Sequence, residues 1–155
     1  MERITTYQNN NAIQRAHSCI PDSILNRLHF DYFTNTDPIY AGLFTGEDTG
    51  DGRSYRNCAC VMYPYHFNCS SQNKTTIVIP EIIPWQYVVH EIGHVLDEYL
   101  GFSVNAVPVS KYARRNRQEA FAEAFTAWLI YGYAETPCKT TSKIDEKTYC
   151  LLESL

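Results

Sequence analysis

Two histidines four residues apart, with a glutamate beside the first, are the residues of this chain best suited to chemistry. His90, Glu91 and His94 lie in the segment His-Glu-Ile-Gly-His. On an α-helix this spacing stacks both imidazoles on one face, about 6 Å apart along the axis, so both can bind one metal ion. Glu91 points about 100° away from His90 around the helix, which puts its carboxylate beside the metal position. Such a match arises by chance roughly 0.01 times in a chain like this. The pattern predicts a zinc site with a neighbouring base.

A third zinc ligand must come from elsewhere in the chain. A catalytic zinc ion takes three protein ligands and keeps its fourth position for water. Glu119 and Glu123 are again four residues apart, on a segment whose other face carries large aromatic residues. One glutamate can bind the ion, and the other can accept the second ring proton of a ligand histidine. We assign this supporting role to Glu123, with Asp97 as a second candidate. The alternative is a pair of solvated glutamates on a helix that packs closely through its alanines.

The two segments resemble the catalytic centre of a known family. The sequences His-Glu-Ile-Gly-His-Val-Leu-Asp-Glu-Tyr-Leu-Gly at 90–101 and Glu-Ala-Phe-Ala-Glu-Ala-Phe at 119–125 are similar to those of the anthrax lethal factor family, which includes the Pro-Pro endopeptidases. The resemblance covers about residues 75–130. It implies Glu119 as the third ligand of one Zn²⁺ ion, and Tyr112, seven residues earlier, as the group that stabilises the transition state. The cysteines and the residues after Gly132 have no counterpart that we recognise in the family.

These residues together predict a zinc-dependent endopeptidase. In the expected mechanism, zinc lowers the pKa of a bound water, and Glu91 takes its proton and passes it to the leaving amine. Tyr112 would donate to the developing oxyanion, and one such donor is worth on the order of 3 kcal/mol. The expected partner is a protein or peptide substrate in an extended conformation. The alternative is a catalytically vestigial zinc-binding protein with a structural or virion role, against which the presence of both Glu91 and Tyr112 speaks.

Helices are predicted around these residues. One spans residues 85–100, begins after Pro84, and stops at Gly101, where a left-handed cap is expected. A second helix is predicted over residues 116–131, and a further one over 142–152. Residues 11–28 are expected to form one or two short helices. The helices predicted at 85–100 and 116–131 carry all the candidate ligands.

Short β-prone runs precede the first of these two long helices. They are separated by glycine, proline, asparagine and serine, and they span residues 30–33, 39–45, 58–63 and 75–79. We expect a small, mostly antiparallel twisted sheet packed on the active-site helix, in one zincin-like α+β domain that covers residues 1–155. The last run contains the candidate edge strand for substrate pairing, formed by Thr76, Ile77, Val78 and Ile79. A buried central strand is the alternative for this run.

Composition limits the classes of partner. Hydrophobic residues make up 45% and charged residues 19% of the 155-residue chain, as in ordinary globular proteins. The net charge of -4 gives no global attraction for nucleic acid. No apolar run is long enough to span a membrane, and no secretory leader is recognised, so we expect neither nucleic acid nor membrane as a partner.

Two weaker features leave their interpretation open. Lys111, Arg114, Arg115 and Arg117 form a local basic patch that could attract an acidic substrate segment or could be a solvated helix start. Six cysteines leave the pairing of the thiols and the cellular compartment undetermined. A metal site at cysteines 58, 60 and 69 is disfavoured, because their spacing differs from that of zinc ribbons.

Overall fold

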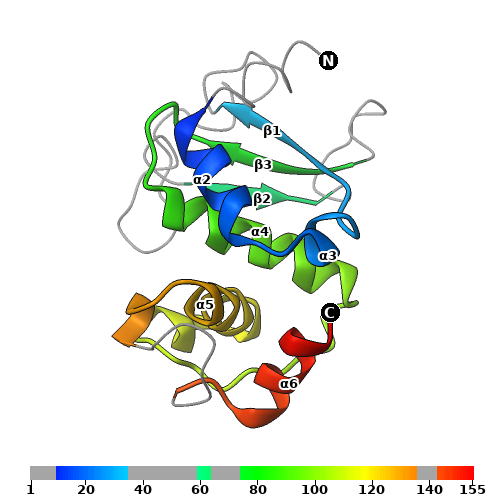
Figure 1. Ribbon diagram of the computed structural model, residues 1–155, viewed down its shortest axis with the longest axis vertical. Coiled ribbons are helices and arrows are strands. Elements are labelled where there is room, and N and C mark those ends of the chain that lie inside the picture. Colours follow the sequence, from blue (N-terminus) through cyan, green and yellow to red (C-terminus); the bar gives the residue numbers. More distant parts are fainter. Residues whose placement is uncertain (1–9, 35–58, 64–73, 136–142) are drawn as a thin grey trace.

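The computed structural model describes residues 10–34, 59–63, 74–135 and 143–155. These residues form an α+β fold with five α-helices and one three-stranded sheet. The helices are α2 (Asn11–Cys19), α3 (Asp22–Leu25), α4 (Trp85–Tyr99), α5 (Arg117–Leu129) and α6 (Glu146–Ser154), and the strands are β1 (Phe30–Thr34), β2 (Cys60–Met62) and β3 (Thr75–Ile79). Two short 3₁₀ helices, η3 (Tyr112–Arg115) and η4 (Tyr133–Glu135), flank α5. Figure 1 shows the sheet above α4, with α5 and α6 below it.

The sheet is mixed, where the sequence predicted a mostly antiparallel one. Its strand order is β1-β3-β2, with β1 parallel and β2 antiparallel to β3. Parallel strands need a long connection, and β1 and β3 are separated by 40 residues of chain. The predicted strand at 39–45 lies outside the described residues.

The prediction that Thr76, Ile77, Val78 and Ile79 form an edge strand is wrong. They belong to β3, which is the central strand of the described sheet and is buried along its whole length. Ile77 and Ile79 pack into the main core with the helices, whereas Val78 packs with Phe33 on the opposite face of the sheet. Both faces of β3 are apolar because both are covered, as expected of a central strand.

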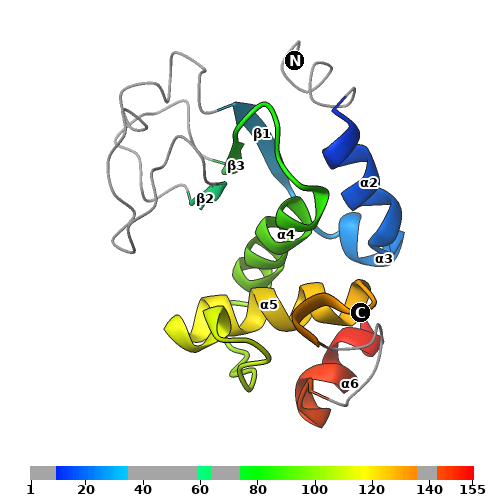
Figure 2. The same cartoon turned by 90° about the vertical axis from the view of Figure 1, so that its left-hand side faces the viewer.

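Helix α4 lies between the sheet and α5, so that little of its surface is exposed. Figure 2 shows α5 crossing below α4, on the side away from the strands. All residues from Val88 to Asp97 are buried. The helix begins at Trp85, as predicted, directly after Pro84 at the N-cap, and it ends at Tyr99, one residue before the predicted end. At its end Gly101 has φ +71°, which confirms the expected left-handed cap.

Gly93 permits the close approach of the two long helices. A Cβ atom at this position would lie 3.0 Å from Cδ1 of Phe125 and 3.1 Å from the Cα of Ala122, both on α5. Alanine is normally the better helix former, by roughly 0.5–1 kcal/mol. At position 93 the steric conflict opposes that gain, because a helix backbone and a buried aromatic ring must move.

We therefore expect Gly93→Ala to lower the free energy of unfolding by about 1–3 kcal/mol, as overpacking does in cores. Urea unfolding followed by circular dichroism measures this change. Gln118→Ala, at an exposed position of α5, is the control and should change stability by about 0.5 kcal/mol or less. A Gly93→Ala variant as stable as the wild type would contradict the close α4–α5 contact.

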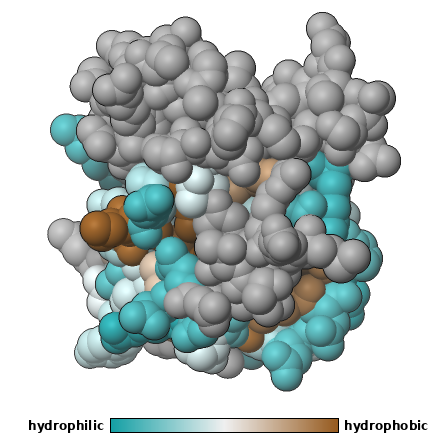
Figure 3. Space-filling view, turned by 90° about the horizontal axis from the view of Figure 1, so that it is seen from above, coloured by the Kyte–Doolittle hydropathy of each residue, from teal (hydrophilic) through white to brown (hydrophobic). Residues whose placement is uncertain are grey.

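No helix among the described residues has both the length and the apolar character needed to span a membrane. In the view from above in Figure 3, the described side chains are mainly hydrophilic, with hydrophobic ones at only a few places.

Candidate metal centre

Three side chains from α4 and α5 meet where the helices cross. The Nε2 atom of His90 lies 2.9 Å from Oε2 of Glu119, and the Nε2 atom of His94 lies 3.4 Å from the same oxygen. The two imidazole rings have centroids 4.9 Å apart and are nearly perpendicular. Of the described residues, these three form the one group of histidine, cysteine and acidic side chains close enough to hold a metal ion.

Two distances between the donor atoms are close to those of a tetrahedral zinc site. Zinc binds imidazole nitrogen and carboxylate oxygen at about 2.0–2.2 Å with tetrahedral geometry, which puts neighbouring donors about 3.3–3.6 Å apart. The distance from His94 to Glu119 falls in this range, and that from His90 to Glu119 is about half an ångström shorter. A set of two histidines and one glutamate is an established type of catalytic zinc site. The residues therefore fit the ion with small side-chain adjustments.

The first turn of α5 fixes the position of Glu119. Asn116 is the N-cap, and its side-chain oxygen accepts a hydrogen bond from the backbone N–H of Glu119 at 2.8 Å. This contact satisfies an N–H group that the start of a helix leaves without an intrahelical partner. The sequence placed the start of this helix at residue 116, one position before the first helical residue. The cap holds Glu119 at the end of α5 nearest the histidines.

Glu123 supports His90 from the side opposite Glu119. Its Oε2 atom accepts a hydrogen bond from Nδ1 of His90 at 3.0 Å. The same carboxylate accepts hydrogen bonds from the hydroxyls of Ser110, at 2.9 Å, and Tyr133. The carboxylate beside His90 is thus the one that the sequence pointed to. A histidine that donates through Nδ1 can offer the lone pair of Nε2 to a metal.

The charges around His90 favour a cation. Burial lowers the pKa of His90, but hydrogen bonds to Glu119 and Glu123 and the charge of Glu91 outweigh burial and raise the pKa to about 10. Burial likewise opposes ionisation of Glu119, yet the hydrogen bonds from His90 and His94 hold the pKa of this carboxyl well below its usual range. The pKa of Glu123 is lowered too, since the His90 contact outweighs burial. Carboxylates that stabilise a proton here also stabilise a divalent cation.

Glu91 and Tyr112 lie beside the three candidate ligands. Glu91 is buried next to His90 and is not one of the clustered donors, in keeping with a base that stands beside the metal. The ring of Tyr112, on η3, packs edge-on against His90 with centroids 5.8 Å apart. The guanidinium of Arg115 lies over the Tyr112 ring, 5.1 Å from its centre. Tyr112 therefore contacts His90, and the charge of Glu91 acts on the same histidine.

Asp97 does not support His90, contrary to the second assignment made from the sequence. Its carboxylate is fully buried and binds Arg117 with both oxygens, at 3.0 and 2.7 Å. Arg117 also donates to the carbonyl of Val104 at 2.7 Å. This ion pair ties the last turn of α4 to the first turn of α5. Arg117 is thereby removed from the predicted basic patch, whose other members, Lys111, Arg114 and Arg115, are exposed.

Ser110, Tyr133 and Tyr63 are the site residues that the sequence did not point to. Tyr63, directly after β2, donates its hydroxyl to the carbonyl of His94 at 3.4 Å. No motif connects these residues with the histidines, because each comes from a different connecting segment. Of the described cysteines, Cys150 is exposed on α6.

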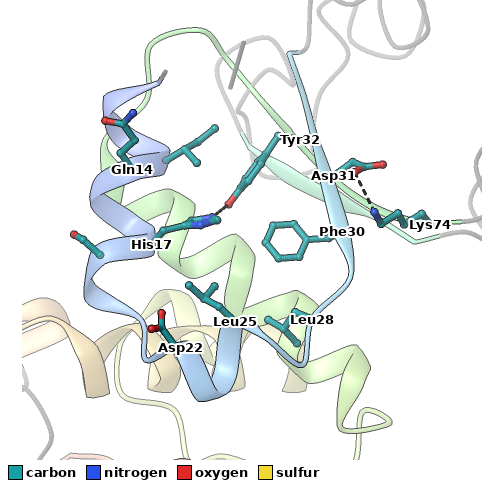
Figure 4. Close-up of a pocket in the computed structure, with 11 residues that line it drawn as sticks. Gln14, His17, Asp22, Leu25, Leu28, Phe30, Asp31, Tyr32 and Lys74 are labelled. Carbon is teal, nitrogen blue, oxygen red and sulfur yellow. Dashed lines mark hydrogen bonds and ion pairs between the residues drawn. The ribbon is translucent and has the colours of Figure 1, made fainter. Parts of the chain in front are cut away.

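A pocket of about 660 Å³ lies elsewhere, between α2 and β1 (Figure 4). Nε2 of His17 and the hydroxyl of Tyr32 form a hydrogen bond of 2.7 Å beside it, and Lys74 pairs with Asp31 at its rim. Burial lowers the pKa of His17. The pocket shares no residue with the candidate metal centre, which lies on the other side of α4.

No protein-family model, curated protein or solved structure matches this chain. The candidate function therefore depends on the geometry of the site.

Proposed function

We propose that this protein is a zinc-dependent endopeptidase with His90, His94 and Glu119 as the ligands of one zinc ion. The observation that carries the proposal is the convergence of these side chains, from two helices separated by 17 residues of chain, at a spacing suited to zinc. A glutamate behind His90 and a buried glutamate beside the site complete the set that a hydrolytic zinc centre needs.

Each remaining group has a role in peptide hydrolysis. Bound zinc would lower the pKa of a water molecule and polarise the substrate carbonyl. Glu91 takes the proton of the attacking water and returns it to the leaving amine. Tyr112 donates a hydrogen bond from its hydroxyl to the oxyanion that forms at the former carbonyl. The residues assigned to these steps correspond to those that the resemblance to the lethal factor family and the Pro-Pro endopeptidases implies, and we place the protein with that group as part of the proposal.

The substrate strand is reassigned from β3 to β2. Of the described strands, β2 is the outer one that contacts α4, and Tyr63 at its end donates to the carbonyl of His94. We propose that an extended peptide adds alongside β2, next to Tyr63 and the part of α4 that carries His94. The proposed substrate is still an extended peptide, and only the strand that binds it differs from the one predicted from the sequence.

Replacing Glu91 with glutamine tests the function. The variant should keep one zinc per chain, because Glu91 is not a ligand, and should lose about 10²- to 10⁴-fold in cleavage rate, the usual contribution of a general base. Zinc content is measured by atomic absorption, and cleavage by mass spectrometry of a degenerate peptide library. Residual cleavage equal to that of the wild type would remove Glu91 from the mechanism.

The Glu91→Gln experiment also distinguishes an enzyme from the alternative class, a zinc-binding protein without activity. A zinc-binding protein with a structural or virion role would hold zinc in both forms and cleave the library in neither. Buried Glu91 and the ring of Tyr112 against His90 favour the enzyme.

A further inference from the structure

The carboxylate of Glu123 receives more hydrogen bonds than a simple supporting group requires. It is buried, with 4% of the residue exposed, and a buried carboxylate is costly unless its oxygens are satisfied. Its Oε2 atom accepts from Nδ1 of His90 and from the hydroxyl of Tyr133, and its Oε1 atom accepts from the hydroxyl of Ser110 at 2.9 Å. Three donors from three different segments hold one carboxylate in one orientation.

The chain around Tyr133 is shaped to bring its hydroxyl back to Glu123. Gly132 has φ +79° and Ala134 has φ +50°, so left-handed residues flank the tyrosine on both sides. A left-handed backbone is unfavourable for alanine, and such residues persist where surrounding contacts hold them. The amide of Tyr133 also donates to the carbonyl of Ile130 at 3.1 Å. The chain thus turns sharply after α5, and Tyr133 lies next to the buried carboxylate.

Ser110 connects Glu123 with the segment that carries Tyr112. Its hydroxyl oxygen accepts a hydrogen bond from the backbone N–H of Ala113 at 3.0 Å, while its proton goes to Glu123. A serine hydroxyl has one proton to donate, so the contact with Ala113 uses a lone pair and leaves the proton for the carboxylate. Ser110 therefore joins η3 to the carboxylate behind His90.

We infer that Ser110 and Tyr133 are positioning residues of the metal centre: their hydroxyls hold Glu123 where it accepts the Nδ1 proton of His90, which directs Nε2 of His90 toward the metal. The inference rests on the proposed zinc site. Without the two hydroxyls the carboxylate can rotate about its side-chain bonds, and His90 loses the contact that selects its tautomer. Neither residue is among the three candidate ligands.

Metal affinity of the full chain tests this assignment. Tyr133→Phe and Ser110→Ala should each weaken Zn²⁺ and Co²⁺ binding by about 10-fold, at the low end of the effect of outer partners of metal ligands. The double variant should lose more than either single one. Affinities are measured by competition with a chromophoric chelator, and the absorption spectrum of bound Co²⁺ reports the ligand geometry.

Three controls separate positioning from folding. Tyr131→Phe removes a hydroxyl from an 80% exposed tyrosine two residues before Tyr133 and should leave affinity unchanged. Ser110→Thr keeps the hydroxyl and should restore affinity to within a few-fold of the wild type. The tautomer of His90, read from ¹⁵N chemical shifts of the imidazole in the zinc-bound protein, should be a single Nδ1–H form in the wild type and a less uniform one in the double variant.

The outcomes are distinct. Double-variant protein that is folded, binds metal as tightly as the wild type and keeps the wild-type Co²⁺ spectrum and His90 tautomer would overturn the role of Ser110 and Tyr133 while leaving the zinc site intact. Wild-type protein that binds neither ion would overturn the proposed function itself, and the inference with it.

Discussion

Glu119→Gln is expected to abolish zinc binding at stoichiometric metal and, with it, all peptide cleavage. The substitution keeps the shape of the side chain and removes the negative charge that His90 and His94 share through one oxygen, at 2.9 and 3.4 Å. An amide oxygen is a poor ligand for zinc compared with a carboxylate. The loss in affinity should exceed the roughly 10- to 100-fold that follows removal of a partner outside the ligand set.

Competition with a chelator of known zinc affinity measures the effect of Glu119→Gln. Glu146→Gln is the matched control, because Glu146 is an exposed glutamate in the first turn of another helix, α6. The control should bind zinc like the wild type. If Glu119→Gln binds zinc within a few-fold of the wild type, Glu119 is not the third ligand.

The second large effect concerns stability. Asp97→Asn is expected to lower the free energy of unfolding by about 3 kcal/mol, the lower end of the range for breaking a buried ion pair. Asp97 is fully buried and paired through both oxygens with Arg117, so the variant leaves a guanidinium facing a neutral amide. A quarter of the Arg117 side chain is exposed and can still be hydrated, which limits the loss.

Urea unfolding of metal-free protein measures this difference, so that zinc binding does not contribute. Asp31→Asn is the control: it breaks the 3.2 Å pair with Lys74, whose side chain is 45% exposed, and should cost about 1 kcal/mol or less. The double variant Asp97→Leu with Arg117→Met should recover much of the lost stability, because it leaves no unpaired buried charge. An Asp97→Asn variant as stable as the control would show that the pair does not hold α4 to α5.

The position of β3 in the sheet could not be predicted from the sequence alone. The run Thr-Thr-Ile-Val-Ile has high β-propensity on both faces, and a single sequence does not reveal which strands become its neighbours. Its central place in the sheet depends on β1 and β2, which pair with β3 from its two sides. The parallel pairing with β1 likewise comes from contacts between distant segments.

The ion-pair partner of Asp97 likewise could not be predicted from helical spacing. Helical spacing puts Asp97 seven residues after His90, on nearly the same face, which made it a reasonable second support for the imidazole. The charge that it meets comes from α5, 20 residues along the chain, and a guanidinium binds a carboxylate with two hydrogen bonds. Crossing of the two helices, which the spacing does not describe, decided this pairing.

The sequence by itself determined the local features of this protein. Spacing of four residues on a helix put His90 and His94 on one face, Gly101 ended that helix, and the next long helix began directly after Asn116. Each of these features depends on backbone geometry within a few residues. The tertiary structure alone decided which groups meet: the close crossing at Gly93, the order of the strands, the Asp97–Arg117 pair, and the two hydroxyls on Glu123. These depend on packing between segments far apart in the chain, where side chains compete for partners that no local pattern specifies.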